Sequence, residues 1–459
     1  MKRIKKKDFC INIFFSLVFI ILICINNSFI GSDSSLMLKV ILDGIVGLIF
    51  ILFSYIKLKG LKNLYRNIEF VYGISFFIYS IVGCIIFILD EYTPRFYYFK
   101  INERILVQTL SIYINTFCIY SMLCFLFNRF KYINYDEAIY RDGNSRILSR
   151  KVLIFFDFVA LFVTLLNLIK IFSYGTSFFN LTTAAKRNVI NSGISHYINL
   201  FMVIYSLFIS LLYFTNESFK KNKSTKINIL SIVIYWLITL TCERRMFVTF
   251  LLGFFFIILV NVKKINFKKL IIAIFIIILL LFSAAIRDNI NFSNHDFVDV
   301  LYSSSTEFYC TFMISDAYTY YNHDLEYGKT YIIDSITKLF PKALLKNKSE
   351  DLSFKFKKEY NTNVGFAFNP IAEGILNFGK IAPLIVAFLM FFICSFANNM
   401  VKKNIMYYII LLTFSLDFCR GAFSNVFFDT IFCFIFIFVM FKVSISKNKK
   451  CIGGKLSER

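Results

Sequence analysis

The sequence predicts an all-α, polytopic integral membrane protein with about 12 transmembrane helices and one long extracytoplasmic loop. Three observations support this class. Of the 459 residues, 58% are hydrophobic and 17% are charged, whereas a soluble domain averages about 45–50% apolar and about 25% charged residues. The apolar residues gather in runs of about 20, the length that crosses a bilayer core of about 30 Å. Lys and Arg residues are alternately many and few in the segments that join these runs.

The composition excludes several other classes of protein. A folded soluble chain lacks the interior volume to hide 60 Phe side chains together with its other apolar residues. This excludes a soluble enzyme, a disordered protein and a nucleic-acid-binding domain. The net charge of +23 suggests a phosphate or an anionic lipid as partner. The positions of the basic residues along the chain decide whether they reflect such a partner or the membrane topology.

The first apolar run extends from Phe9 to Ile30 and follows Met1-Lys-Arg-Ile-Lys-Lys-Lys7. It is too long for the apolar part of a signal peptide and lacks a small-residue cleavage site, so we interpret it as the first transmembrane helix. All spans must be helices, because lipid offers no partner to an unpaired backbone amide. The predicted spans are 9–30, 36–56, 70–89, 105–127, 152–173, 197–214, 227–242, 246–262, 270–286, 380–398, 405–418 and 428–442.

The orientation follows from the basic residues between the spans. Segments on one side carry 31 Lys and Arg residues, counting Lys442 at the edge of the last span, whereas the short segments on the other side carry 8. The positive-inside rule therefore predicts that both termini lie in the cytoplasm. The remaining connection, residues 287–379, is a long outer loop, and such loops escape the charge rule. Most of the charge of +23 therefore reflects topology.

Within the long outer loop, residues 330–345 show helical periodicity. Ile332, Ile336, Leu339 and Phe340 fall on one face, and Asp334, Lys338 and Lys342 fall mainly on the other. This pattern predicts an amphipathic helix that lies on the outer membrane surface or over a cavity. A helix packed within the loop is the alternative.

Arginines recur at the predicted outer ends of the helices, where the positive-inside rule does not explain them. A guanidinium group offers a rigid fork of donors that suits a phosphate or a diphosphate. Each arginine taken singly also fits a snorkelling or ion-paired helix end. The predicted diphosphate-binding residues are Arg187, Arg244, Arg245, Arg287 and Arg420.

Candidates for acid–base chemistry lie on the same predicted side. Glu373 is flanked by apolar residues, which disfavour the charged carboxylate and suit the group to act as a base. Glu243 and Asp288 can pair with the arginines beside them. No CxxC pair, metal-ligand spacing, P-loop or dinucleotide fingerprint is present, so no metal and no cofactor are predicted. The remaining candidates are Asp33, Glu307, His196, His295 and His323.

Roughly residues 150 to 440 resemble the Wzy-type O-antigen and capsular oligosaccharide repeat-unit polymerases. The resemblance rests on a short arginine turn, Glu243-Arg-Arg245, and on an arginine, Arg287, that opens a long outer loop. It continues through Tyr327-Gly-Lys-Thr-Tyr331, Leu339-Phe-Pro-Lys342 and Gly365-Phe-Ala-Phe-Asn-Pro-Ile-Ala-Glu-Gly-Ile-Leu-Asn-Phe-Gly379. Many relatives carry a small residue, a single arginine and Gly at the arginine turn, so either Arg244 or Arg245 matches that arginine.

The resemblance implies a GT-C-like glycosyltransferase in the bacterial cytoplasmic membrane that polymerises lipid-linked oligosaccharides without a metal ion. Undecaprenyl diphosphate would carry the growing glycan, arginines would stabilise the leaving diphosphate, and Glu373 would deprotonate the attacking hydroxyl. Glu373, Arg245 and Arg287 are thus the predicted catalytic residues, with Glu307 and His323 as further candidates. Membrane lipid and a chain-length regulator protein are the implied partners, and nucleic acid is not.

Two other functions fit parts of the pattern. An O-antigen-ligase-like glycosyltransferase would share the topology and the arginines but would use a His of the long loop, either His295 or His323. A lipid-linked oligosaccharide flippase belongs to another class, in which repeated halves and ionisable groups near the membrane midplane are common. The predicted spans contain few such groups, namely Asp43, Asp157 and Lys170.

Overall fold

The computed structural model describes most of the predicted spans and part of the long loop. The described residues are 6–28, 36–89, 103–130, 150–175, 177–181, 183–190, 195–215, 223–242, 244–261, 311–320, 323–340, 344–345, 349–361, 368–401 and 405–453. Arg287, Asp288, Glu307, His295, Asp33, Glu243 and the predicted span 270–286 lie outside them.

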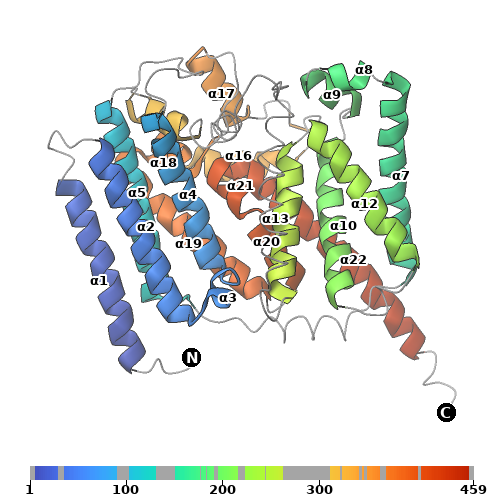
Figure 1. The fold of residues 1–459 in the computed structure, drawn as a ribbon, viewed down its shortest axis with the longest axis horizontal. Coiled ribbons are helices and arrows are strands. Elements are labelled where there is room, and N and C mark those ends of the chain that lie inside the picture. Colours follow the sequence, from blue (N-terminus) through green and yellow to red (C-terminus); the bar gives the residue numbers. More distant parts are fainter. Residues whose placement is uncertain are drawn as a thin grey trace. The chain divides into compact units, whose positions relative to one another are not determined.

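All regular elements of the described residues are helices (Figure 1). Seven of these helices are long and apolar enough to cross a membrane, and shorter apolar helices accompany them, so the chain is a polytopic membrane protein. The helices are α1 (Lys6–Ser28), α2 (Leu36–Leu58), α3 (Leu61–Leu64), α4 (Ile68–Leu89), α5 (Glu103–Leu126), α7 (Arg150–Tyr174), α8 (Ser177–Asn180), α9 (Thr183–Ile190), α10 (Ser195–Thr215), α12 (Lys223–Cys242), α13 (Arg244–Asn261), α16 (Lys329–Lys338), α17 (Leu352–Glu359), α18 (Pro370–Phe378), η1 (Gly379–Ile381), α19 (Ala382–Val401), α20 (Ile405–Thr413), α21 (Ser415–Arg420) and α22 (Phe423–Gly453).

The predicted spans that fall on described residues each coincide with a helix, with one exception. The single helix predicted over 405–418 is wrong, because the chain forms α20 and α21 with an interruption at Phe414. The hydroxyl of Thr413 bonds the carbonyl of Ile409 over 2.7 Å. Such a side-chain bond to the preceding turn bends helices, and it precedes the interruption directly.

The chain divides into two compact units. Unit 1 comprises Met1–Ile133, Ser305–Asn399 and Phe414–Phe428, and unit 2 comprises Asn134–Ser304, Met400–Thr413 and Asp429–Arg459. In unit 1, α1, α2, α4 and α5 pack side by side (Figure 1). A Cβ at Gly73 of α4 would lie 2.5 Å from the ring of Phe50 in α2, so this glycine permits the close approach of the two helices.

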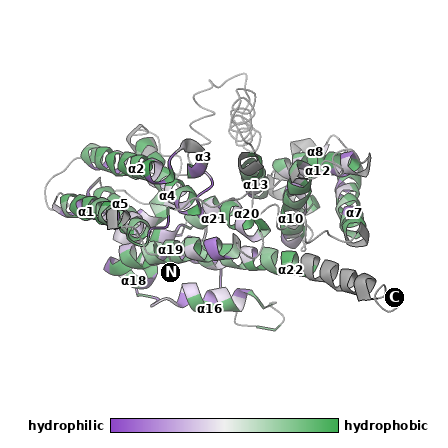
Figure 2. Cartoon of the chain, turned by 90° about the horizontal axis from the view of Figure 1, so that it is seen from below, coloured by the Kyte–Doolittle hydropathy of each residue, from purple (hydrophilic) through white to green (hydrophobic). Residues whose placement is uncertain are grey.

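Unit 2 is built on α10, α12 and α13. The Trp236 ring of α12 stacks on Phe250 of α13 with centroids 4.7 Å apart, and its Nε1 donates to Ser206 of α10 over 3.0 Å. On α7, apolar residues such as Phe172 are exposed by 78%. Exposed apolar side chains on a helix of spanning length face lipid, and Figure 2 shows how apolar the long helices are.

The ionisable residues within the spans have local partners. Asp43 accepts a hydrogen bond from Ser80 over 2.9 Å, and Asp157 accepts one from Tyr205 over 2.7 Å. Lys170 donates to the carbonyl of Ile190 over 3.2 Å. Polar groups in an apolar surrounding need such partners, so these contacts are consistent with a role in packing.

Candidate functional site

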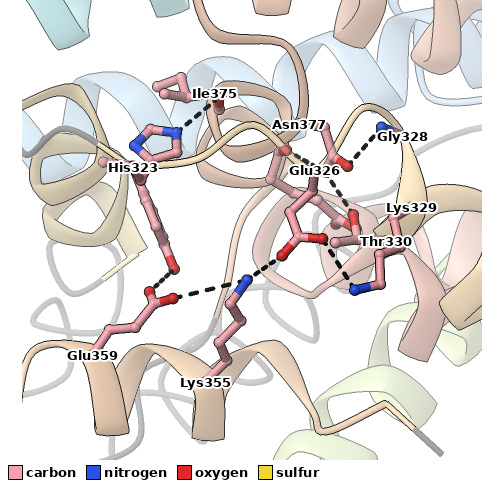
Figure 3. A network of polar contacts seen from close by, with 11 residues as sticks. His323, Glu326, Gly328, Lys329, Thr330, Lys355, Glu359, Ile375 and Asn377 are labelled. Atoms are coloured by element: carbon pink, nitrogen blue, oxygen red, sulfur yellow. Dashed lines mark hydrogen bonds and ion pairs between the residues drawn. The ribbon is translucent and has the colours of Figure 1, made fainter.

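Two groups of polar residues contain predicted site residues, and one group lies in each unit. The first lies in unit 1, where α16 is attached to α18. Asn377 donates to Thr330 over 2.7 Å and accepts from the Gly328 amide over 2.9 Å (Figure 3). The Tyr327 amide donates to the Asn377 carbonyl over 3.1 Å. Gly328 has a φ of 85°, a left-handed conformation that glycine adopts without strain, and it begins α16 at this attachment.

Glu373 is the centre of this group. Its side chain is fully buried, and each carboxylate oxygen accepts a hydrogen bond: Oε1 from the Thr330 hydroxyl and Oε2 from the Phe423 amide, both over 2.7 Å. The first amides of a helix have no partner within that helix, and a carboxylate is favoured at this positive end. Glu373 thus joins α16 and α18 to the start of α22. Its catalytic role stays a prediction.

The start of α18 follows directly from its sequence. Asn369 caps the helix by accepting from the Ala372 amide over 2.8 Å, and Pro370 occupies the first turn, where no amide donor is needed. The side-chain nitrogen of Asn369, Nδ2, also donates to the Ser315 hydroxyl over 2.8 Å. The Ser315 hydroxyl in turn lies 3.0 Å from the hydroxyl of Tyr113 in α5. Residues 368–378 are therefore fixed against a spanning helix.

Charged pairs connect the remaining loop helices. Lys355 of α17 contacts Glu326, and Lys329 lies 3.4 Å from the same carboxylate (Figure 3). Burial acts to raise the pKa of Glu326, but the hydrogen bonds and charges of Lys355 and Lys329 outweigh it, so the pKa lies below its ordinary value. Lys338, at the end of α16, donates to Ser424 over 2.9 Å and also contacts Asn425.

The second group lies in unit 2 and contains Arg245. Its Nη2 donates to Oδ2 of Asp429 over 3.4 Å, and Nε2 of His196 lies 2.7 Å from Oδ1 of the same residue. Asp429 is only 2% exposed, whereas the side chains of Arg245 and His196 are 32% and 39% exposed. The buried carboxylate of Asp429 therefore holds the guanidinium of Arg245 and the imidazole of His196. Both side chains are partly exposed, so they are able to contact an anionic ligand.

The other described sequence candidates belong partly to unit 2 and partly to unit 1. Arg187 lies on α9 and Arg244 opens α13, both in unit 2 with Arg245. Arg420 ends α21 in unit 1, close along the chain to Phe423, whose amide binds Glu373. His323 lies 3.3 Å from the Ile375 carbonyl through Nε2 and packs its ring edge-on against Tyr318. These contacts fit a positioning role for His323 in the loop.

Sequence reasoning missed Asp429 as a site residue. The signal was present, because Asp429 is an acid within the apolar helix Phe423–Val439, and an ionisable residue in such a helix indicates function. The pair of His196 and Asp429 could not be predicted, since nothing in the sequence connects the two residues. Among the described residues, no three His, Cys, Asp or Glu side chains gather closely enough to hold a metal ion.

Comparison with known proteins gives one match. The model of a protein family described as O-antigen polysaccharide polymerase Wzy matches residues 9–450. No curated protein and no solved structure matches the chain.

Proposed function

The chain belongs to the O-antigen polysaccharide polymerase Wzy family, whose activity is the polymerisation of lipid-linked repeat units, and we propose that it uses a polyprenyl diphosphate donor. A hydroxyl of the incoming lipid-linked repeat unit attacks the anomeric carbon of the growing glycan. The new glycosidic bond forms as the bond to the diphosphate breaks. The polyprenyl diphosphate leaves with the electron pair, and a base takes the hydroxyl proton.

The observation that carries this proposal is the arrangement around Arg245. Its guanidinium is partly exposed and is held by the buried carboxylate of Asp429. A guanidinium fixed in this way can stabilise the charge that develops on a leaving diphosphate. Arg187, Arg244, Arg287 and Arg420 are the further proposed diphosphate ligands, and with them the chemistry requires no metal ion.

Two residues are proposed as the base. Glu373 has the predicted chemistry, but it is fully buried and both of its oxygens accept hydrogen bonds within the protein, so the packing around it must open before a substrate hydroxyl can reach it. His196 is partly exposed and paired with Asp429. A carboxylate beside an imidazole orients the ring and stabilises its protonated form. This pair favours His196 as the second candidate.

We further propose that the reaction takes place on the outer face of the bacterial cytoplasmic membrane, with both termini in the cytoplasm. The support is the excess of Lys and Arg in alternate connecting segments. Undecaprenyl-diphosphate-linked oligosaccharides are the proposed substrates, and a chain-length regulator protein is a proposed partner.

The proposal is tested with Arg245→Ala, Arg287→Ala and Arg420→Ala in a strain that lacks the native gene. Each variant should abolish long glycan chains while protein level and membrane insertion stay normal. Removal of one such transition-state contact costs about 3–4 kcal/mol, a loss of roughly 10²–10³ in rate. Arg104→Ala is a matched control, because Arg104 lies in the first turn of α5 but is no proposed ligand. Polymer of normal length in all three variants would disprove the diphosphate assignment.

The same strains distinguish polymerisation from ligation. Loss of a polymerase leaves single repeat units attached to the acceptor, whereas loss of a ligase leaves no glycan attached. The family match favours the polymerase over both the ligase and the flippase. Glycan analysis of the deletion strain is therefore expected to show single attached units.

A further inference from the structure

The helix α16 has its polar side buried and its apolar side exposed. Thr330, Asp334 and Ser335 are at most 5% exposed, whereas Ile332, Ile333 and Ile336 are between 52% and 64% exposed. The exposed apolar surface continues beyond the end of the helix with Leu339 and Phe340. A helix on a water-facing surface shows the opposite arrangement, so this face is suited to an apolar partner.

The contacts of α16 fix its rotation about its own axis. Its start is bonded to Asn377 through Thr330 and Gly328, and its last residue, Lys338, is bonded to Ser424. The ring of Tyr331 stacks on Phe378, with centroids 5.9 Å apart. A rotation of α16 that turned its isoleucines toward the protein would break these hydrogen bonds and the ring contact. The apolar face is therefore a fixed surface of unit 1.

The segment that leads into α16 adjoins a membrane-spanning helix. Leu325, just before α16, lies against Gly379 at the turn that leads into α19. The candidate span Pro370–Met400 contains α19, and its residues Ile381 and Leu384 are exposed by 59% and 43%, as expected of side chains that face lipid. The helix α16 itself packs against α18 (Figure 2), which precedes α19 in the same candidate span.

The residues at the start of α16 suit the boundary between lipid and water. Tyr327 is 82% exposed, and the side chain of Lys329 is 54% exposed. Tyrosine and lysine are favoured at this boundary, because each combines an apolar body with a polar or charged end.

We propose that α16 is anchored in the membrane–water interface, with Ile332, Ile333 and Ile336 among the lipid acyl chains. Three features carry the proposal: the fixed rotation of the helix with its apolar side outward, the position of Leu325 beside the turn that leads into the lipid-facing helix α19, and the boundary residues at its start. Because the other side of α16 holds Glu373 through Thr330, the membrane would fix the height of that carboxyl group. The proposal does not depend on the assignment of the diphosphate ligands.

The direct test uses the unmodified full-length protein in vesicles of phosphatidylethanolamine and phosphatidylglycerol. An apolar carbene reagent, dissolved in the lipid and activated by light, should label the peptide that contains Ile332–Ile336 and, as a positive control, the peptide that contains Phe172 of α7. Hydroxyl radicals generated in water should leave Ile332–Ile336 unmodified. Labelling from water alone would overturn the proposal. Absence of both labels would also overturn it, since it would show that protein covers the face.

A second measurement uses fluorescence, because the chain contains a single Trp. Ile336→Trp in a Trp236→Phe background should emit at shorter wavelength and lose intensity with lipids that carry a nitroxide near the headgroup. Lys358→Trp on α17 is the control, since the side chain of Lys358 is 68% exposed, and it should be quenched by iodide instead. Equal quenching by iodide at both positions would contradict the anchoring of α16.

Discussion

The guanidinium of Arg245 donates a hydrogen bond to the carboxylate of Asp429, with 3.4 Å between Nη2 and Oδ2. Asp429 is buried, and its other oxygen lies 2.7 Å from Nε2 of His196. A buried charge is stable only when it is paired. Asp429 therefore depends on these partners and, in turn, sets the direction of both side chains.

Asp429→Asn should reduce polymer length and yield while the protein remains inserted. The amide keeps the shape of the side chain but removes its charge, and a hydrogen bond to a charged group is worth about 1.5–3 kcal/mol. We expect a loss of roughly tenfold to a hundredfold in rate, measured with purified lipid-linked repeat units. Asp157→Asn is the matched control, because Asp157 binds Tyr205 in the same unit without contacting Arg245. Unchanged activity in Asp429→Asn would remove Asp429 from the site.

Glu373→Gln separates a base from a structural residue. The amide oxygen can still accept from the Phe423 amide, and the amide nitrogen can donate to the Thr330 hydroxyl, so the connection of the helices is largely kept. If Glu373 is the base, the variant is stable but inactive. Thermal unfolding in detergent and polymerisation are measured together. Activity near that of the native protein would show that Glu373 is structural and would leave His196 as the proposed base.

His323→Gln should still produce polymer. The His323 Nε2 lies 3.3 Å from the Ile375 carbonyl, and the glutamine amide can donate to the same oxygen. A small loss of thermal stability is expected, because the edge-on contact of the ring with Tyr318 is lost. Glycan chain length on gels measures the first effect. Complete loss of attached glycan would instead indicate the ligase chemistry that uses a loop histidine.

The stability of the protein should depend on the pH through Asp316. Burial raises the pKa of this carboxyl to about 7, although the hydrogen bond from Thr109 opposes the shift. Because the folded state favours the neutral acid, its stabilising contribution is complete below about pH 4, the range of an ordinary Asp, and is lost as the pH rises through about 7. Asp316→Asn should flatten this dependence in thermal unfolding between pH 4 and pH 8. An unchanged slope would contradict the assignment to Asp316.

Much of the fold could be predicted, whereas less of the site could. The helix limits follow from apolar runs, and the start of α18 follows from Asn369-Pro370. The interruption at Phe414 was not predicted, because the residues around it are as apolar as those of an unbroken span. The predicted helix 330–345 ends earlier, at Lys338, and the Pro at position 341 disfavours helical geometry in the residue before it. The apolar residues around Glu373 single it out in the sequence, but its two partners, Thr330 and Phe423, come from distant segments.

The sequence by itself determined the class of the protein, because the hydrophobic cost of exposing long apolar runs to water leaves only a membrane as their surroundings. It also determined the family, through motifs that keep their order along the chain. Only the tertiary structure decided which polar groups meet: Asp429 with Arg245 and His196, and Glu373 with Thr330 and Phe423. It also decided that the apolar side of α16 faces outward. Partners far apart in the sequence leave no periodic pattern, because each contact depends on how separate helices pack.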